Sequence, residues 1–318
     1  MGRHHARILQ STPRVAFAGA VDPGGDRWGV VRDPSLVFAT LEDALAAGPI
    51  DLAVVAVPTE DHLAAARDLA GRGIHVLIEK PLASTAAEAR EIIAACDAGG
   101  VRGAVGHVER FNPALIELRK RIREGQLGEI FLIATERSGP FPDRIKDVGV
   151  VKDLATHDLD IVRWLGGDIA RVSAQTQHRM GRVHEDMVLV NGSLTSGVSF
   201  NCLVDWLSPT KVRRTRVLGE RGMLVADTLT ADLTFYANGD VASEWGATQA
   251  LRGVSEGDMT RYALARREPL LAEIEAFTDL IAGAPSDIVT LADGLGVVAC
   301  AEAVLESAAG QRTVEVPA

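Results

Sequence analysis

The chain has 318 residues, of which 47% are hydrophobic and only 4% aromatic, which is enough apolar material for two globular domains or one large one. Its formal net charge of -10 argues against an electrostatic grip on nucleic acid or anionic lipid, and its three widely spaced cysteines argue against a disulfide framework or a structural zinc site. No apolar run approaches the roughly 20 residues of a membrane-spanning helix, so we expect a cytoplasmic protein.

The first residues resemble the end of a dinucleotide-binding turn. They read Met-Gly-Arg-His-His-Ala-Arg, in which Gly2 corresponds to the last glycine of a G-x-G-x-x-G turn and opens a helix. Strand and helix patterns then alternate. The expected strands lie at 14–21, 51–57, 74–78 and 101–106, and the expected helices begin at 40 and span 60–71 and 85–97. This alternation predicts a doubly wound parallel sheet.

The rhythm changes near residue 129, where strand patterns follow one another with few helices between them. The expected strands are 130–137, 170–177, 187–195, 198–206, 215–218, 223–227 and 232–236, and the expected helices are 152–165, 270–281 and 291–307. This order predicts a second, α/β domain on a large open, mostly antiparallel sheet. We place the first domain at 1–112 and the second at 113–318, with the last helices free to pack back on the first domain.

The strongest local motif is Ile-Glu-Lys-Pro at 78–81, at the end of a predicted parallel strand. Ligands of such sheets bind beyond the carboxyl ends of the strands, so Lys80 is placed to give and take a proton there. A surface lysine before a turn proline is the alternative interpretation.

A second motif lies on the helix that begins near residue 152. Asp153 and His157 are four residues apart and share one helix face, with Asp160 three residues further on. Together with Lys80 they form a candidate proton relay for oxidising a sugar hydroxyl. Alternatively, Asp153 only complements the helix dipole and His157 is a satisfied core histidine. A metal site at Asp153, His157 and Asp160 is a further alternative, but no additional ligand cluster supports it, and we predict none.

Two weaker signals indicate a cofactor. Asp22 follows a predicted strand, 20 residues after Gly2, where an acidic side chain accepts hydrogen bonds from an adenosine ribose and repels a 2'-phosphate. This favours NAD over NADP. Pro58 and Thr59 follow another predicted strand, so Thr59 either faces the same crevice or merely caps a helix.

In their order and spacing, these motifs resemble the glucose-fructose oxidoreductase and inositol dehydrogenase family (Gfo/Idh/MocA) over nearly the whole chain. The motifs are residues 1–7, Val-Asp-Pro at 21–23, Val-Pro-Thr at 57–59 with His62, Glu-Lys-Pro at 79–81, Gly-His-Val-Glu-Arg-Phe-Asn-Pro at 106–113, and Asp153 with His157. The resemblance implies a Rossmann domain followed by an α/β domain whose exposed sheet face makes homodimers or homotetramers.

The resemblance also implies roles for individual residues. Lys80 would be the catalytic lysine, with Asp153 and His157 as its partners in proton transfer. The expected cofactor contacts are Gly2, Arg3, Asp22, Pro58, Thr59, His62 and Glu79, and the expected substrate contacts are His107, Arg110, Asn112 and Arg144.

Within the family, residues 139–153 are similar to members that act as UDP-N-acetylglucosamine 3-dehydrogenases. Arg144 and Lys146 would meet a diphosphate, although solvated loop charges explain them equally well. We therefore expect an NAD-dependent oxidoreductase of a sugar or nucleotide-sugar hydroxyl. The alternatives are a dehydrogenase of myo-inositol or another free sugar, a cofactor-poor regulatory homologue, and a reductase of an imine or tetrapyrrole.

The chain departs from the family pattern at its start. Members carry about ten more residues, which supply the first, central strand and the two glycines that approach the pyrophosphate. Our hypothesis is that the natural product starts upstream and that Met1 is an internal methionine, which a stop codon directly before Met1 would contradict. A less favoured hypothesis makes residues 15–21 the first strand and Gly24 with Gly25 the phosphate loop.

Overall fold

The computed structural model describes residues 1–142, 145, 148–239 and 256–317, and the chain forms two compact units. Unit 1 comprises Met1–Val108 and Glu268–Val298, and unit 2 comprises Glu109–Arg267 and Ala299–Ala318. The domain limits that we placed at 1–112 and 113–318 stay a prediction.

Unit 1 contains a four-stranded sheet in the order β14-β5-β4-β3, in which β3, β4 and β5 are parallel and β14 is antiparallel. Its strands are β3 (Leu52–Val55), β4 (His75–Glu79), β5 (Gly103–Gly106) and β14 (Val289–Thr290), with a separate pair, β1 (Ala20–Val21) and β2 (Val37–Phe38). Its helices are α1 (Gly2–Leu9), α2 (Leu41–Ala47), α3 (His62–Gly71), α4 (Ala86–Ala98) and α8 (Pro269–Ile281), with short 3-10 turns η1 (Pro34–Leu36) and η2 (Thr59–Asp61).

Local sequence explains where these elements begin. Strand β4 is central, and Val76, Leu77 and Ile78 are fully buried, as its apolar run predicts for a parallel strand covered on both faces. Thr40 caps α2 by accepting a hydrogen bond from the Asp43 amide, and Thr85 forms a capping box with Glu88 at the start of α4. The alternation of parallel strands with helices is therefore confirmed.

The prediction of a strand at 14–21 is wrong for residues 14–19. Only Ala20 and Val21 are strand, and they pair with β2 in a separate two-stranded sheet. A strand needs a neighbour for its backbone groups, and in the described chain residues 15–19 have none. This result also overturns the hypothesis that residues 15–21 replace the first strand of the parallel sheet.

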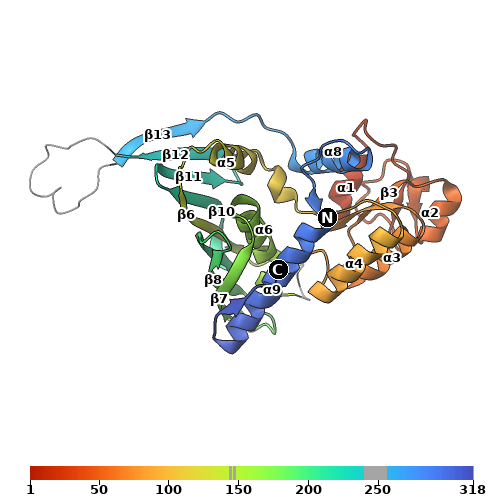
Figure 1. Cartoon of the computed structure of the whole chain (residues 1–318). Helices are drawn as coiled ribbons and strands as arrows, with labels where there is room; N and C mark the ends of the chain where they lie inside the picture. Colours follow the sequence, from red (N-terminus) through yellow and green to blue (C-terminus); the bar gives the residue numbers. More distant parts are fainter. Residues whose placement is uncertain (143–144, 146–147, 240–255, 318) are drawn as a thin grey trace, which may run out of the picture. The chain divides into compact units, whose positions relative to one another are not determined.

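Unit 2 is built on a nine-stranded sheet in the order β13-β12-β11-β10-β6-β9-β8-β7-β15 (Figure 1). All neighbours are antiparallel except β6 and β9. The strands are β6 (Ile130–Pro140), β7 (Ile169–Gln177), β8 (Met187–Leu194), β9 (Ser199–Asp205), β10 (Leu207–Gly219), β11 (Gly222–Asp227), β12 (Asp232–Asn238), β13 (Glu256–Tyr262) and β15 (Val314–Glu315). The predicted large, mostly antiparallel sheet is confirmed.

The helical elements of unit 2 line its core. They are η3 (Val108–Phe111), α5 (Pro113–Arg123), the π-helical turn η4 (Val151–Ala155), α6 (Thr156–Gly166) and the second part of α9 (Leu291–Gly310), which the two units share. Helix α6 packs on β6 and β9, and α5 packs on β11 and β12. Apolar side chains alternate along the strands, as Leu224 and Ala226 of β11 illustrate by being fully buried.

Helix α5 was not predicted, although a start signal is present. Asn112 caps it by accepting a hydrogen bond from the Ala114 amide, and Pro113 occupies its first turn. The same dipeptide belongs to the motif from which substrate contacts were predicted. No helix in the described part of the chain is both long and apolar enough to cross a membrane.

Candidate active site

In unit 1, predicted site residues follow the carboxyl ends of all three parallel strands. Pro58 and Thr59 come after β3, Lys80 directly after β4, and His107 directly after β5. The carboxyl ends of parallel strands meet at the same edge of a sheet, where ligands of such sheets bind. Lys80 is half-buried at this edge, and its peptide bond to Pro81 is cis.

His62 connects two of these strand ends. It is 1% exposed, and its Nδ1 lies 3.1 Å from the carbonyl oxygen of Pro81 and 3.2 Å from that of Leu82. Its Nε2 lies 3.2 Å from the carbonyl oxygen of Val57. Burial lowers the pKa of His62, although the carbonyl partners oppose this effect. The ring therefore links the segment after β3 to the turn that carries Lys80, and its predicted cofactor contact stays a prediction.

Glu79 is held in place from two directions. Its Oε1 lies 2.6 Å from His5 Nε2, and its Oε2 accepts a hydrogen bond from the Lys80 amide at 3.3 Å. Both side chains of the pair are buried. His5 lies on α1 and was not predicted, because its partner is 74 residues away in the sequence. The pair joins α1 to the strand end that carries Lys80.

Glu273 of α8 is a second buried carboxyl group near Glu79. It is fully buried, and neither carboxyl oxygen has a hydrogen-bond partner within the described residues. Burial raises the pKa of Glu273 well above its ordinary value of 4.5, and the charge of Glu79 adds to this effect. Burial therefore favours the protonated, neutral form of this carboxyl group in the folded protein.

Replacing Glu273 by glutamine is expected to stabilise unit 1 at neutral pH. The raised pKa means that the folded state holds a proton that the unfolded state releases, so stability falls as the pH rises above 4.5. The gain should therefore be absent below pH 4.5 and grow as the pH rises above it, by up to about 1.4 kcal/mol for each pH unit over which the folded protein keeps the proton. Urea unfolding over this range measures it, with exposed Glu60→Gln as the control. A gain that does not depend on pH would contradict the assignment.

Three of the residues predicted to contact the cofactor lie near the start of unit 1. Asp22 is exposed directly after β1, and its Oδ1 accepts a hydrogen bond from the Gly24 amide at 2.7 Å. Gly2 and Arg3 form the first turn of α1, whose amides have no partner inside the helix. A Cβ on Gly2 would lie 3.9 Å from its nearest neighbour, the Ala56 side chain, so the structure itself does not require glycine there.

In unit 2, Asp153 and His157 are half-buried residues of two consecutive helical segments. Between residues 151 and 160 they are half-buried together with Lys152 and Leu154, whereas the other residues of this stretch are buried. Asp153 belongs to the π-helical turn η4, and His157 to the first turn of α6. π-helical turns are rare and frequent at functional sites. That Asp153 and His157 share one helix face stays a prediction.

Glu185 anchors the start of this helix and was not predicted. Its Oε1 accepts a hydrogen bond from the Val151 amide at 3.0 Å, and its carbonyl oxygen accepts one from the Val150 amide at 3.0 Å. A Cβ on Gly149 would lie 2.0 Å from this carboxylate, so only glycine permits the approach. A glutamate in a loop gave no sequence signal for this role.

The predicted substrate residues of unit 2 have different environments. Arg110 is buried and donates to Asp160, whose carboxylate the metal hypothesis had included. Asn112 is buried, caps α5 and donates to the carbonyl oxygen of Thr228. Arg144, like Lys146, lies outside the described residues. Substrate contacts of Arg110, Asn112 and His107 stay predictions. Within the described ranges, no group of three or more potential metal ligands occurs.

A buried ionic cluster supports the same helix. Arg137 on β6 donates to Asp158 of α6 at 2.7 Å and to Glu109 at 3.0 Å. Burial alone lowers the pKa of Arg137, but the two carboxylates outweigh this effect and raise it. Sequence reasoning missed this cluster, although Arg137 occupies a core-facing position of a predicted strand.

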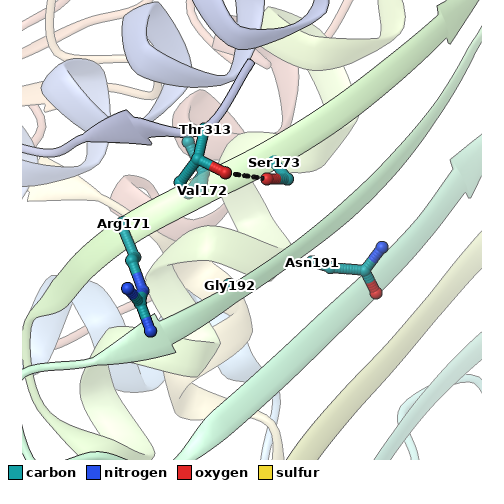
Figure 2. A pocket seen from close by; sticks show the side chains of 6 residues that line it. All are labelled: Arg171, Val172, Ser173, Asn191, Gly192 and Thr313. Atoms are coloured by element: carbon teal, nitrogen blue, oxygen red, sulfur yellow. Dashed lines mark hydrogen bonds between the residues drawn. The ribbon is translucent and has the colours of Figure 1, made fainter. Parts of the chain in front are cut away.

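A separate shallow pocket lies on unit 2, in the sheet region of β7 and β8 (Figure 2). Its volume is about 220 Å³, and Ser173 Oγ lies 2.7 Å from Thr313 Oγ1 at its edge. Its lining residues are Arg171, Val172, Ser173, Asn191, Gly192 and Thr313. None of the predicted site residues belongs to it.

Comparison with known proteins matches both halves of the chain to one family. Residues 1–107 match "Oxidoreductase family, NAD-binding Rossmann fold", and residues 119–316 match "Oxidoreductase family, C-terminal alpha/beta domain" of the Gfo/Idh/MocA group. UDP-N-acetylglucosamine 3-dehydrogenase of Acidithiobacillus ferrooxidans is 28% identical over 89% of this chain and 86% of its own length. Its crystal structure superposes with a TM-score of 0.81 over 96% of this chain and 93% of that chain, at 27% identity.

Other relatives broaden the range of substrates. Myo-inositol dehydrogenase Hyg17 of Streptomyces leeuwenhoekii is 29% identical over 97% of this chain and 91% of its own. The rhizopine catabolism protein MocA of Rhizobium meliloti is 31% identical over 52% of this chain, a match that spans 54% of that protein. The two family matches cover most of the sequence and agree with the fold of each unit. The chain belongs to the Gfo/Idh/MocA family of NAD-dependent oxidoreductases.

Proposed function

We propose that the protein oxidises a hydroxyl group of a sugar or nucleotide sugar to a carbonyl, or reduces that carbonyl, with Lys80, Asp153 and His157 as its catalytic residues. The observation that carries this proposal is that Asp153 and His157 are half-buried on a π-helical turn and the helix after it, where most other residues of 151–160 are buried. Lys80 follows the central parallel strand of unit 1. These are an amine, an imidazole and a carboxylate, which together can transfer and hold a proton.

In this mechanism the three side chains share the proton chemistry of the substrate hydroxyl. NAD, when bound, supplies the carbon that accepts the hydride. Lys80 accepts the hydroxyl proton during oxidation and returns it during reduction. His157 donates a hydrogen bond to the hydroxyl oxygen, and Asp153 orients the imidazole. Asp22 accepts hydrogen bonds from the adenosine ribose hydroxyls and disfavours a 2'-phosphate, so we propose NAD rather than NADP.

Among substrates, we favour a UDP-sugar such as UDP-N-acetylglucosamine, oxidised at the 3-position. The similarity to the Acidithiobacillus ferrooxidans enzyme supports this choice, because it extends over most of both chains. A free sugar or myo-inositol is the second candidate, supported by the equally extensive similarity to the Streptomyces leeuwenhoekii enzyme. A cofactor-poor regulatory homologue is the third.

The test is a substrate screen with purified protein. UDP-sugars, free sugars and inositols are incubated with NAD or NADP, and reduced cofactor is followed by absorbance. We expect turnover with NAD and a UDP-sugar. Turnover with inositol alone would support the second candidate. Calorimetric titration that detects no NAD or NADH binding would support the regulatory homologue and refute the proposed enzyme.

We also propose that unit 2 pairs with a second copy of the chain through the open face of its sheet. Strand registers align Leu132, Leu218, Met223, Tyr236 and Met259 into one apolar row across five neighbouring strands. Leu218, Tyr236 and Met259 are 39%, 40% and 65% exposed. A continuous apolar row on a flat face is self-complementary under two-fold symmetry, as a homodimer or homotetramer requires.

Replacing Leu218 by glutamate is therefore expected to convert the oligomer to a monomer. A charge within an apolar contact would be desolvated without a partner, which weakens association by several kcal/mol. Sedimentation velocity reports the mass of each species. Leu229, which is 52% exposed in the turn after β11, provides the matched control Leu229→Glu. A wild-type chain that sediments as a monomer would refute the proposal.

For the cellular location, we propose a reducing compartment, consistent with the cytoplasm. All three cysteines are free and buried. Burial raises the pKa of Cys96 to about 11 and that of Cys300 to about 12. Buried neutral thiols are chemically inert and need no oxidising environment.

A further inference from the structure

We propose that Arg110 and Glu109 are positioning residues, which set the rotation of α6 and thereby the direction of the His157 side chain. This inference rests on the proposed function, in which His157 acts on the substrate hydroxyl. The two residues are adjacent in the chain and both reach α6, one directly and one through Arg137.

The direct link is a two-pronged ion pair. Arg110 Nε donates to Asp160 Oδ2 at 2.9 Å, and Arg110 Nη2 donates to Asp160 Oδ1 at 2.5 Å. The side chains are 7% and 1% exposed. A bidentate guanidinium–carboxylate pair fixes orientation as well as distance, because both planes must align.

The indirect link runs through the core of unit 2. Glu109 Oε1 accepts a hydrogen bond from Arg137 Nη1 at 3.0 Å, and Arg137 Nε donates to Asp158 Oδ2 at 2.7 Å. Arg137 and Asp158 are 4% and 2% exposed. Arg137 stands on β6, so this link ties α6 to the sheet as well as to Glu109.

The two links lie on either side of His157 around the helix. At about 100° per residue, Asp158 is rotated about 100° one way from His157, and Asp160 about 60° the other way. Rotation of α6 about its axis would therefore break one link or the other. Both carboxylates are buried whereas His157 is half-buried, so fixing the rotation of α6 fixes the side of the helix from which the imidazole extends.

The helical geometry changes just before His157, which explains why α6 needs separate contacts to fix its rotation. Residues 151–155 form a π-helical turn, whose wider hydrogen bonding departs from the regular α-helical ladder. Asp153 and His157 therefore lie on either side of a change in helical geometry. Glu185 fixes the start of the turn through the Val151 amide, whereas the links to Asp158 and Asp160 fix the helix after it.

The test is a double-mutant cycle between Asp160 and His157. Asp160→Asn, His157→Asn and the double variant are compared with the wild-type protein, using the substrate found in the screen. Asp160→Asn should lower kcat at least about 10-fold while the KM for NAD changes less than about 2-fold. In the His157→Asn background, Asp160→Asn should lower kcat by less than about 2-fold, because a residue that acts through the His157 imidazole has no effect once the imidazole is gone. Equal losses in both backgrounds would overturn the proposal.

Arg110→Lys keeps the positive charge but cannot make the two parallel hydrogen bonds to Asp160. It therefore provides a second variant if Asp160→Asn fails to fold. Asp168→Asn is the matched control. Asp168 is exposed just after α6, and it pairs with Arg163, which lies on α6. The NMR signal of the His157 ring, assigned with His157→Asn, is a readout independent of turnover. Arg110→Lys should shift it and Asp168→Asn should leave it in place; an unmoved signal in Arg110→Lys would overturn the proposal. Absence of turnover in the wild-type protein would instead refute the proposed function.

Discussion

Replacing Lys80 by methionine is expected to lower kcat by about 10³-fold while leaving NAD binding nearly unchanged. Methionine has a similar length and volume but cannot accept or donate a proton, and general acid–base catalysis is worth about 10²- to 10⁴-fold. Lys80 directly follows β4, and its backbone amide, which the substitution retains, donates to Glu79. Steady-state turnover and calorimetric NAD titration measure the two quantities separately.

Lys120 offers the matched control for this substitution. It lies on α5, and its side chain is 58% exposed beside Glu117 and Glu124. Lys120→Met should leave turnover and NAD affinity unchanged, because an exposed ion pair contributes little. If Lys80→Met turned over at the rate of Lys120→Met, Lys80 would have no part in proton transfer.

Replacing Arg137 by methionine is expected to destabilise unit 2 by about 3–5 kcal/mol. The arginine is the central cation of the buried cluster, with Asp158 and Glu109 as its partners. Its loss leaves Asp158 as a charge in the core without compensation, and burial of that kind is costly even though the net value of the intact pair is small. Urea unfolding followed by circular dichroism measures the change.

An exposed arginine in the same unit serves as the control. It shows how much any Arg→Met substitution changes the free energy of unfolding when no buried charge is left unpaired. Arg312 pairs with Glu306, and the two side chains are 60% and 56% exposed. Arg312→Met should change the free energy of unfolding by less than about 1 kcal/mol. The double variant Arg137→Met with Asp158→Leu should recover part of the loss, because it removes the buried charge. Equal destabilisation by Arg137→Met and Arg312→Met would contradict the assignment.

Much of the fold was predictable because the hydrophobic period of a segment reflects its own burial. The apolar run at 76–78 predicted a strand covered on both faces, and the alternation along β11 predicted a sheet with one buried face. Thr40 and Thr85 marked helix starts correctly. Strand β13 was missed because its sequence, Glu-Gly-Asp-Met-Thr-Arg-Tyr, is largely polar, as an edge strand allows.

The candidate site was predictable only where its residues are close in the sequence. Asp153 and His157 are four residues apart, so helical periodicity alone was enough to predict that they lie near each other. His5 and Glu79 are 74 residues apart, and Arg110 and Asp160 are 50 apart, so no local pattern joins them. The unpredicted residues are mostly those that hold the predicted ones in place. The strand prediction was wrong at residues 14–19 for a related reason. A strand needs a neighbouring strand to pair with, and its own sequence does not specify that neighbour.

The chain enters unit 1 twice, first with residues 1–108 and again with residues 268–298. Arg7 and Arg14, at α1 and just beyond it, pair with Glu268 and Asp279 of the second segment. A ribosome makes the whole of residues 109–267 between these two segments. During synthesis, unit 1 therefore cannot complete its fold until residues 268–298 have been made. By then most of the sequence of unit 2, the larger unit, has already been synthesised.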